Sequence, residues 1–381
     1  MSSNEFSLSA GSGTGEAGAA RPADPAPEVQ PGLAGVVAFE TEIAEPDKDG
    51  GELRYRGVNI EDLAGKVPFE QVWGLLVDES LQPGLPYEHI DLERRTGSYV
   101  SDLQSTLAAL SGEWMLGQFI DIDDDQAKED LRRLSAAALS IVAQSARGAD
   151  LPPVPPETVA AGETAAERFV LEWRGEPDEK SAKAIDTYWI CTAEHGLNAS
   201  TFTARIVAST GADAGAALAS AVGALSGPLH GGAPARVLPM LDAVAESGDA
   251  EKWVADALGR GERIMGFGHR VYRAEDPRSR VLKRVAKELG SPLVAVAEEL
   301  ERVAHEAIAK KSPSHSWTNV EYWSAVVLDV AGVPPQLAPA MFACSRTAGW
   351  SAHILEQKRL GVLVRPSALY VGPGARSLQE V

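Results

Sequence analysis

Cysteine and positive charge are both scarce in this sequence. Its 381 residues include only two cysteines, Cys191 and Cys344, which lie far apart and form no CxxC pair. This spacing excludes a disulfide framework and a cysteine-based structural zinc site, so both are expected to be buried thiols. The formal net charge of −19 argues against nucleic-acid binding, which requires a dense basic surface.

Long apolar runs are missing as well. The longest weakly polar run, residues 214–229, is mostly Ala, Gly and Ser, too short and too weakly hydrophobic to span a bilayer. The sequence opens Met1-Ser2-Ser3-Asn4-Glu5, without the basic and apolar regions of a secretory signal. We therefore expect a cytoplasmic protein that does not bind membranes.

Signatures of several enzyme classes are also absent. The sequence contains no Walker A motif, no GxSxG elbow and no HExxH pair. Residues 266–271 lack the third glycine and the preceding strand of a dinucleotide-binding fingerprint. Separations of 35 and 39 residues between His195, His230 and His269 match no common metal-ligand spacing, so no metal site is expected.

Helical periodicity dominates what remains. Residues 1–32 are rich in Gly, Ala, Ser, Pro and Glu, and we predict a disordered tail there. The β-prone stretch 36–43, the turn-forming stretch 47–51 and the alternating stretch 52–56 predict a β-hairpin. Nearly every later segment has helical spacing, which predicts a mainly α fold. The first expected helix begins at Pro68, and the others cover 131–142, 185–209, 214–226, 237–244, 253–258, 281–289, 300–308, 319–331 and 339–358.

A basic segment interrupts this acidic chain. Between Arg260 and Arg284 there are seven Arg and one Lys against three acids, a local excess of five positive charges. Gly266 and Gly268 precede His269 there, and glycine permits left-handed geometry or close approach of the backbone to a ligand. An imidazole, guanidinium groups and bare backbone together suit a polyanionic substrate. The alternative is a loop before a basic, solvated helix face.

Other candidate residues carry alternatives of their own. His230, like His269, lies beside glycines at an expected break between helices, where side chains are often aimed into clefts. His195 lies near a helix, where a lone histidine is more often a core or surface group with satisfied hydrogen bonds. Glu321 follows Asn319 in the first turn of a helix, where an acid also meets the helix dipole favourably. Arg346 and Arg365 are isolated arginines in apolar surroundings. A partly buried arginine needs a carboxylate or phosphate partner, which is either an internal acid or a ligand.

Taken together, these segments resemble citrate synthase from about residue 35 to residue 374. The resemblance rests on several short motifs in order: Tyr55-Arg56-Gly57, His195-Gly196-Leu197-Asn198-Ala199-Ser200-Thr201, Gly227-Pro228-Leu229-His230-Gly231-Gly232-Ala233, Gly266 to Tyr272, Asp276-Pro277-Arg278, Asn319-Val320-Glu321, and Arg346 with Gly349-Trp350. It implies a mostly helical homodimer, with residues 33–231 and 333–381 in a large domain and 232–332 in a small one. The helix 214–226, rich in small residues, would lie deep in the fold or in the dimer interface.

The resemblance also implies condensation of acetyl-CoA with oxaloacetate, without a permanently bound cofactor. Glu321 would be the base, His230 would stabilise the enol, and His269 would polarise the oxaloacetate carbonyl. The oxaloacetate carboxylates would be held by His195, Arg278, Arg346 and Arg365, the last from the partner subunit. Coenzyme A would contact Arg273, Gly266, Gly268 and Lys311.

One residue departs from the family pattern. The family base is normally Asp in Asn-Val-Asp, whereas this chain has Asn319-Val320-Glu321. The extra methylene moves the carboxylate by about 1.5 Å, and a misplacement of about 1 Å can cost on the order of 10²-fold in rate. Two alternatives therefore stay open beside citrate synthase: a 2-methylcitrate synthase that uses propionyl-CoA, and a silent family member that senses oxaloacetate or CoA.

Overall fold

The computed structural model describes residues 29–380 except 34, 48, 50, 83, 232–235 and 270. It divides the chain into two units, residues 41–364 and residues 1–40 with 365–381. The described part of the second unit contains two short 3₁₀ turns, Pro31–Leu33 and Leu378–Glu380. Residues 1–28 of the predicted tail lie outside the described residues.

The first unit begins with the predicted hairpin, extended by a third strand. Strands β1 (Ala44–Asp47), β2 (Glu52–Tyr55) and β3 (Val58–Asn59) form an antiparallel sheet in the order β1-β2-β3. The first strand was wrongly expected at 36–43. Val37 in that stretch is 88% exposed, whereas Ile43 at its end is buried. Pairing starts only where Ala44 lies opposite Tyr55, because β-propensity does not report where a strand finds its partner.

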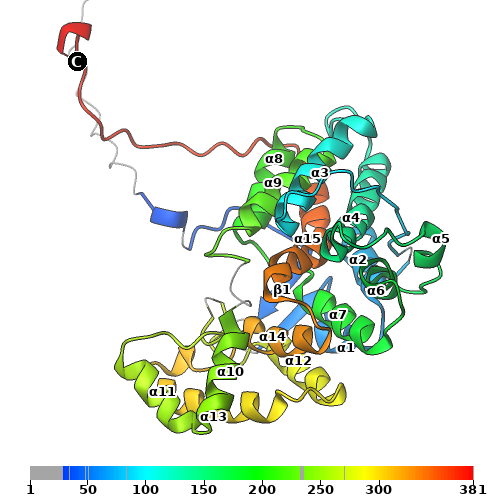
Figure 1. Cartoon of the computed structure of the whole chain (residues 1–381). Coiled ribbons are helices and arrows are strands. Elements are labelled where there is room, and N and C mark those ends of the chain that lie inside the picture. Colours follow the sequence, from blue (N-terminus) through cyan, green and yellow to red (C-terminus); the bar gives the residue numbers. More distant parts are fainter. Residues whose placement is uncertain are drawn as a thin grey trace, which may run out of the picture. The chain divides into compact units, whose positions relative to one another are not determined.

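Helices make up the rest of this unit, which confirms the mainly α fold (Figure 1). The described residues form α1 (Ile60–Leu63), α2 (Phe69–Asp78), α3 (Tyr99–Glu113), α4 (Asp124–Arg147), α5 (Pro156–Val159), α6 (Ala165–Arg174), α7 (Glu179–Thr192), α8 (Ala199–Ser209), α9 (Ala214–Leu225), α10 (Val237–Ser247), α11 (Ala250–Gly259), α12 (Pro277–Glu288), α13 (Val294–Ala309), α14 (Val320–Val330) and α15 (Ala338–Leu360).

The helix expected over 185–209 is in fact two helices, α7 and α8. Asn198 ends the break between them, because its side-chain oxygen accepts a hydrogen bond from the Thr201 amide at 3.1 Å and so caps α8. Gly196 within the break has φ +64°, a left-handed conformation that glycine adopts without steric cost. His195 lies in this break, outside both helices. The helical spacing of the sequence did not indicate that a helix ends there.

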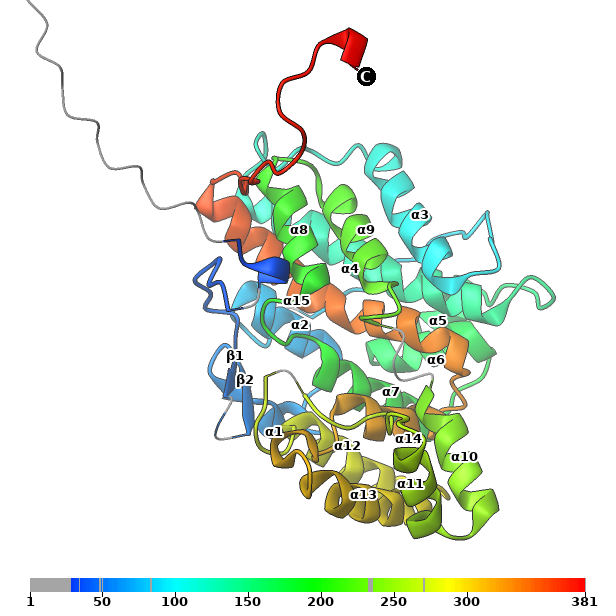
Figure 2. The same ribbon diagram turned by 90° about the vertical axis from the view of Figure 1, so that its left-hand side faces the viewer.

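Helix α7 lies between two groups of helices (Figure 2). On one side it contacts α2, α6 and α15, and α15 also packs against α4, α8 and α9. On the other side it contacts α12 and α14, which pack together, and α10, α11 and α13 complete this second group. Both groups therefore meet at α7. The boundaries given above for a large and a small domain stay a prediction.

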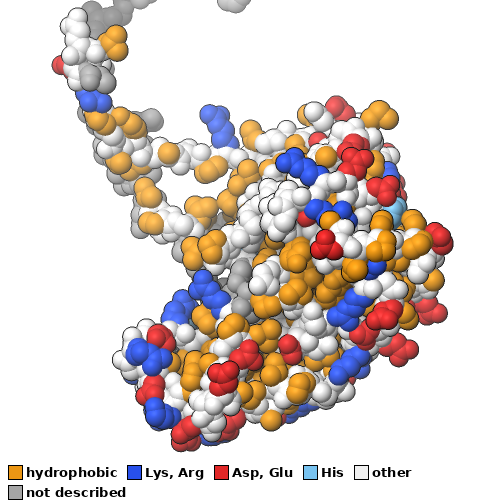
Figure 3. All heavy atoms as spheres, in the orientation of Figure 1, with side chains coloured by type: hydrophobic (Ala, Val, Ile, Leu, Met, Phe, Trp, Pro, Cys, Tyr) orange, Lys and Arg blue, Asp and Glu red, His pale blue; other side chains and the backbone are white. Residues whose placement is uncertain are grey.

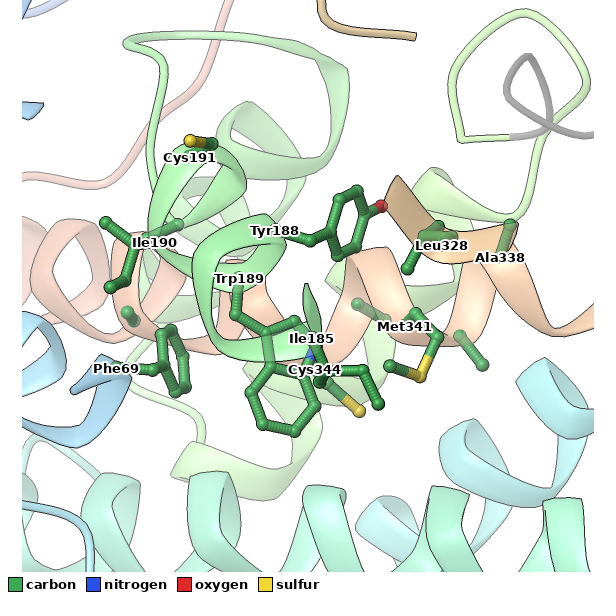
Figure 4. Packing of buried hydrophobic residues seen from close by; sticks show 14 of the residues in the cluster. Phe69, Ile185, Tyr188, Trp189, Ile190, Cys191, Leu328, Ala338, Met341 and Cys344 are labelled. Atoms are coloured by element: carbon green, nitrogen blue, oxygen red, sulfur yellow. The ribbon is translucent and has the colours of Figure 1, made fainter. Parts of the chain in front are cut away.

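Aromatic and aliphatic side chains fill the core around α7 (Figure 4). The Trp189 ring lies 5.3 Å from the rings of both Phe69 and Phe169, measured between centroids. Cys191 and Cys344 are both fully buried free thiols, as predicted. On the face seen in Figure 3, acidic and basic side chains are intermixed and form no continuous basic surface.

Candidate active site

A cavity of about 160 Å³ brings together residues that lie far apart in the sequence. Six of the predicted site residues line it, namely His195, His230, His269, Arg278, Glu321 and Arg346. The other lining residues are Tyr188, Thr192, Asn198, Val320, Ser324 and Phe342. The cavity therefore combines three imidazoles, two guanidinium groups and one carboxylate, while the role of each residue stays a prediction.

Hydrogen bonds from Asn319 hold the segment before His269 against the start of α14. The Asn319 amide donates to the Gly266 carbonyl at 2.8 Å, and the Asn319 side chain donates to the Gly268 carbonyl at 3.0 Å. Gly266 has φ +78°, and a Cβ there would lie 2.8 Å from Cβ of Tyr322. Glycine at 266 therefore lets the two segments approach closely. These contacts lie within the chain, and the assignment of Gly266 and Gly268 to coenzyme A stays a prediction.

The His269 ring is neutral and held by its own loop. Its Nδ1 accepts hydrogen bonds from the amides of Val271 at 2.9 Å and Tyr272 at 3.1 Å. Burial, followed by the positive charge of Arg278, lowers the pKa of His269 to about 4. Since Nδ1 is an acceptor, the ring proton lies on Nε2, which is 3.1 Å from Nη2 of Arg278. Two donors thus face each other, an arrangement that an oxygen accepting from both would relieve.

The two arginines of the cavity differ in how their charge is balanced. Arg278 donates to both carboxylate oxygens of Asp276, at 2.9 and 2.7 Å, and both side chains are buried. Arg346 is equally buried, yet among the described residues no carboxylate lies within 4.0 Å of it. Its Nε donates to the Thr192 carbonyl at 2.8 Å, and its guanidinium lies 4.7 Å from the Phe342 ring centre. Burial lowers the pKa of Arg346, and the charge of Glu194 opposes that shift. An anionic ligand would add a direct ion pair.

His230 is held by residues that the sequence analysis did not select. Ser200 Oγ lies 2.8 Å from Nε2 of His230 and 2.9 Å from the side-chain oxygen of Asn198. Trp350 donates from its indole nitrogen to the same Ser200 oxygen at 3.1 Å. Burial, followed by the charge of Arg346, lowers the pKa of His230 to about 4, so this imidazole is also neutral near pH 7. Ser200 and Trp350 belong to the quoted motifs, but nothing in the sequence indicated that they meet.

Glu321 lies in the first turn of α14 with its side chain lining the cavity. The capping role belongs to Asn319, whose side-chain oxygen accepts from the Glu321 amide at 3.0 Å. Burial raises the pKa of Glu321, and the positive charges of Arg278 and Arg263 oppose that shift. A carboxylate with a raised pKa is suited to act as a general base close to neutral pH.

Among residues 41–364, four predicted residues do not line this cavity, namely Gly266, Gly268, Arg273 and Lys311. Arg273 is 76% exposed and lies 3.6 Å from Asp49, and Lys311 is exposed just after α13. Arg365 belongs to the unit formed by residues 1–40 and 365–381. Their assignments to coenzyme A and oxaloacetate stay predictions.

Most cations of the basic segment, residues 260–284, form ion pairs with carboxylates of the same chain. Five of its eight cations lie within 4.0 Å of a carboxylate, namely Arg260, Arg273, Arg278, Arg280 and Lys283. Arg270 lies outside the described residues. Of this segment, only His269 and Arg278 line the cavity, so the anion site draws its second guanidinium from Arg346 on α15. The role of this segment in binding a polyanionic substrate stays a prediction.

The described residues include neither a cluster of metal ligands nor a membrane-spanning helix. No group of three or more His, Cys, Asp or Glu side chains in this part of the chain is arranged to hold a metal ion. No helix there is both long and apolar enough to cross a membrane.

Comparisons with known proteins agree with one another. The family model for the citrate synthase C-terminal domain matches residues 32–367. A Mycobacterium tuberculosis protein provisionally named citrate synthase 2 is 58% identical over 354 residues, covering 92% of this chain and 95% of the relative. Citrate synthase of Haloferax volcanii is 36% identical, covering 91% and 96%. The 2-methylcitrate synthase of Mycobacterium tuberculosis is 33% identical, covering 93% of each chain.

A solved structure supports the same assignment. The ternary complex of Thermoplasma acidophilum citrate synthase with carboxymethyl coenzyme A and oxaloacetate superimposes with a TM-score of 0.79 at 27% identity, covering 93% of this chain and 99% of that one. The family match spans most of the chain, and the relatives are covered almost completely. The chain therefore belongs to the citrate synthase family and is an acyltransferase of that family.

Proposed function

We propose that this protein condenses acetyl-CoA with oxaloacetate and hydrolyses the resulting thioester to give citrate and CoA. The observation that carries the proposal is the cavity in which Glu321, His230 and His269 converge beside the buried Arg346. A base, neutral hydrogen-bond donors and an anion site are what this condensation requires of an enzyme.

Oxaloacetate fits the positive side of the cavity because it carries two carboxylates. One carboxylate would pair directly with Arg346, which has no carboxylate within 4.0 Å among the described residues. Arg278 already has Asp276 as a partner, so it would add hydrogen bonds more than net charge. The substrate carbonyl oxygen would accept from Nε2 of His269, which removes the donor–donor contact with Arg278. His195 and, from a partner subunit, Arg365 complete the proposed oxaloacetate site.

The new carbon–carbon bond would join the methyl carbon of the thioester to the carbonyl carbon of oxaloacetate. It would form in the part of the cavity between Glu321 and His269. Glu321 would remove a proton from the methyl group of the thioester while His230 donates a hydrogen bond to the thioester oxygen. The enol carbon would then attack the oxaloacetate carbonyl, and His269 would give its Nε2 proton to the new alkoxide. Because His230 and His269 both have a pKa of about 4, they would act as neutral donors, and water would hydrolyse citryl-CoA in the final step.

Glutamate replaces the family aspartate as the base. Its raised pKa, caused by burial, favours proton abstraction once the carboxylate is formed, since a more basic group accepts a proton more readily. Val320 and Ser324 line the cavity on the same helix as Glu321, and we propose that this wall accommodates the longer side chain.

The further proposals concern assembly and coenzyme binding. We propose a homodimer with the two-domain division given above, and with Arg273 and Lys311 facing coenzyme A. A groove of about 590 Å³ between α3 and α9 has several small side chains, including Ala108, Ala216 and Ala219. Small side chains permit close helix approach, so we propose this face for the dimer contact. Analytical ultracentrifugation of the whole chain tests the dimer directly.

The decisive experiment follows CoA release with a thiol reagent. Acetyl-CoA and oxaloacetate together should release thiol, and neither alone should do so. A preference for propionyl-CoA in kcat/KM would identify a 2-methylcitrate synthase instead; one methylene is worth about 1–3 kcal/mol in such discrimination. Thermal stabilisation by oxaloacetate without any thiol release would indicate a sensor and would refute the proposal.

A further inference from the structure

Tyr272 lies behind the cavity and contacts two of its histidines. It is 2% exposed and does not line the cavity. Its hydroxyl oxygen is 3.1 Å from Nε2 of His195, and its ring centre lies 5.3 Å from the His195 ring and 4.8 Å from the His269 ring. The two imidazoles lie 5.2 Å apart and edge to face. Tyr272 is therefore in contact with both imidazoles without facing a ligand in the cavity.

The direction of the Tyr272–His195 hydrogen bond follows from the requirement that a buried hydroxyl proton has an acceptor. In the described part of the chain, Nε2 of His195 is the partner of the Tyr272 hydroxyl. The phenol keeps its proton, because burial raises the pKa of Tyr272. The imidazole is neutral, because burial followed by the charge of Arg278 lowers the pKa of His195 well below its usual value. Tyr272 is thus the donor and Nε2 the acceptor.

A neutral imidazole that accepts at Nε2 carries its proton on Nδ1. The Tyr272 hydroxyl therefore selects one tautomer of His195 and restricts rotation of its ring. The backbone of Tyr272 acts on the second histidine, since its amide donates to Nδ1 of His269 and fixes the opposite tautomer there. One residue thereby gives the two neighbouring imidazoles different donor nitrogens.

We propose that Tyr272 is a positioning residue for oxaloacetate, acting through the tautomer and orientation of His195. The inference rests on the proposed function, in which His195 contacts oxaloacetate. It adds a residue that carries no charge and does not touch the substrate. Tyr272 should therefore affect oxaloacetate binding more than the acyl-CoA chemistry.

The test is a double-mutant cycle of Tyr272→Phe with His195→Asn. Tyr272→Phe should raise KM for oxaloacetate about 3- to 10-fold and change kcat and KM for acetyl-CoA by less than twofold. In the His195→Asn background, the same change should add almost nothing, because Tyr272 acts through His195. Equal effects in both backgrounds would mean that Tyr272 only supports packing, and would overturn the inference.

A matched control removes the same kind of bond elsewhere. The Tyr87 hydroxyl lies 3.1 Å from Nδ1 of His89, and neither residue lines the cavity. Tyr87→Phe should leave KM for oxaloacetate unchanged. A KM increase in Tyr87→Phe as large as in Tyr272→Phe would also count against a specific role.

A second measurement does not depend on the fold of any Tyr272 variant. Ring-¹⁵N NMR of the wild-type protein, with the His195 signals assigned by their loss in His195→Asn, should show the proton on Nδ1. A proton on Nε2 would refute the inference. Failure of the proposed function would look different, because wild-type protein would then release no thiol from acetyl-CoA and oxaloacetate.

Discussion

Ser200 Oγ lies 2.8 Å from Nε2 of His230, and Trp350 donates to the same oxygen from the other side at 3.1 Å. The Ser200 hydroxyl has one proton and two acceptors within reach, His230 and the Asn198 side chain. Because Trp350 can only donate, it occupies one lone pair of the Ser200 oxygen, and the hydroxyl proton and the second lone pair remain for Asn198 and His230. The serine therefore controls how His230 meets the acyl group.

Ser200→Ala should lower kcat. The change leaves the buried indole N–H of Trp350 and Nε2 of His230 without their shared partner, which costs about 1–3 kcal/mol, or roughly 5- to 150-fold in rate. KM for oxaloacetate should change much less, since Ser200 does not line the cavity. Steady-state kinetics would measure both. Ser135→Ala is the control, because Ser135 is buried against Ser351 at 3.3 Å, outside the cavity. Equal kcat values for Ser200→Ala and Ser135→Ala would contradict the role of Ser200.

The fall of kcat/KM at acid pH should report the protonation of Glu321. Its pKa is raised by burial and held back by the charges of Arg278 and Arg263. His230 and His269 have pKa values of about 4, so neither titrates near pH 6.5. The base must be ionised to act, and kcat/KM should therefore rise with pH through the Glu321 pKa, above pH 4.5.

Arg263→Gln provides the test. Without that positive charge the Glu321 carboxylate is less stabilised, so its pKa and the acid limb of kcat/KM should move upward by roughly a few tenths of a pH unit, and less at high salt. Arg260→Gln is the matched control, because Arg260 is an exposed arginine on the same loop that pairs with Glu262. A downward shift in Arg263→Gln, or the same shift in both variants, would contradict the assignment.

Short motifs and the resemblance they carry named six residues that line one cavity, and the roles of these residues stay predictions. The motifs could not predict the contacts that orient those residues. Ser200 and Trp350 are 150 positions apart, and His195 and Tyr272 are 77 apart. Which residues meet at such separations depends on the packing of α7, α8, α12 and α15, and helical periodicity carries no information about it.

Element types were easier to predict than their limits. The turn at 47–51 correctly indicated a hairpin, but β-propensity moved its first strand to 36–43, because propensity does not report where a strand finds its partner. The break between α7 and α8 was missed although Gly196 and Asn198 are both helix-ending or helix-capping residues. The apolar spacing on either side continued through the break and concealed it.

The two buried arginines should differ in their effect on stability. Arg278→Met leaves Asp276 buried without its partner, and breaking such a pair costs about 3–5 kcal/mol. Arg346→Met removes a guanidinium that has no carboxylate within 4.0 Å among the described residues, so its cost should be clearly smaller. Urea unfolding at pH 7 would compare them. Both variants should lose oxaloacetate binding by calorimetry, and equal losses of stability would show that the charge of Arg346 is balanced as fully as that of Arg278.

Glu321 is the residue whose replacement should affect the rate most. Glu321→Gln keeps the size of the side chain but removes its basicity, and kcat should fall by about 10²- to 10⁴-fold. Glu321→Asp restores the family residue but withdraws the carboxylate by about one bond, which should cost on the order of 10²-fold if the cavity is shaped for glutamate. Thiol release at saturating substrates measures both variants, and calorimetry with oxaloacetate should show unchanged binding, because Glu321 contributes no positive charge to the anion site. If Glu321→Asp is faster than the wild type, the cavity is still shaped for aspartate, and the native chain is then a weakened enzyme or a sensor.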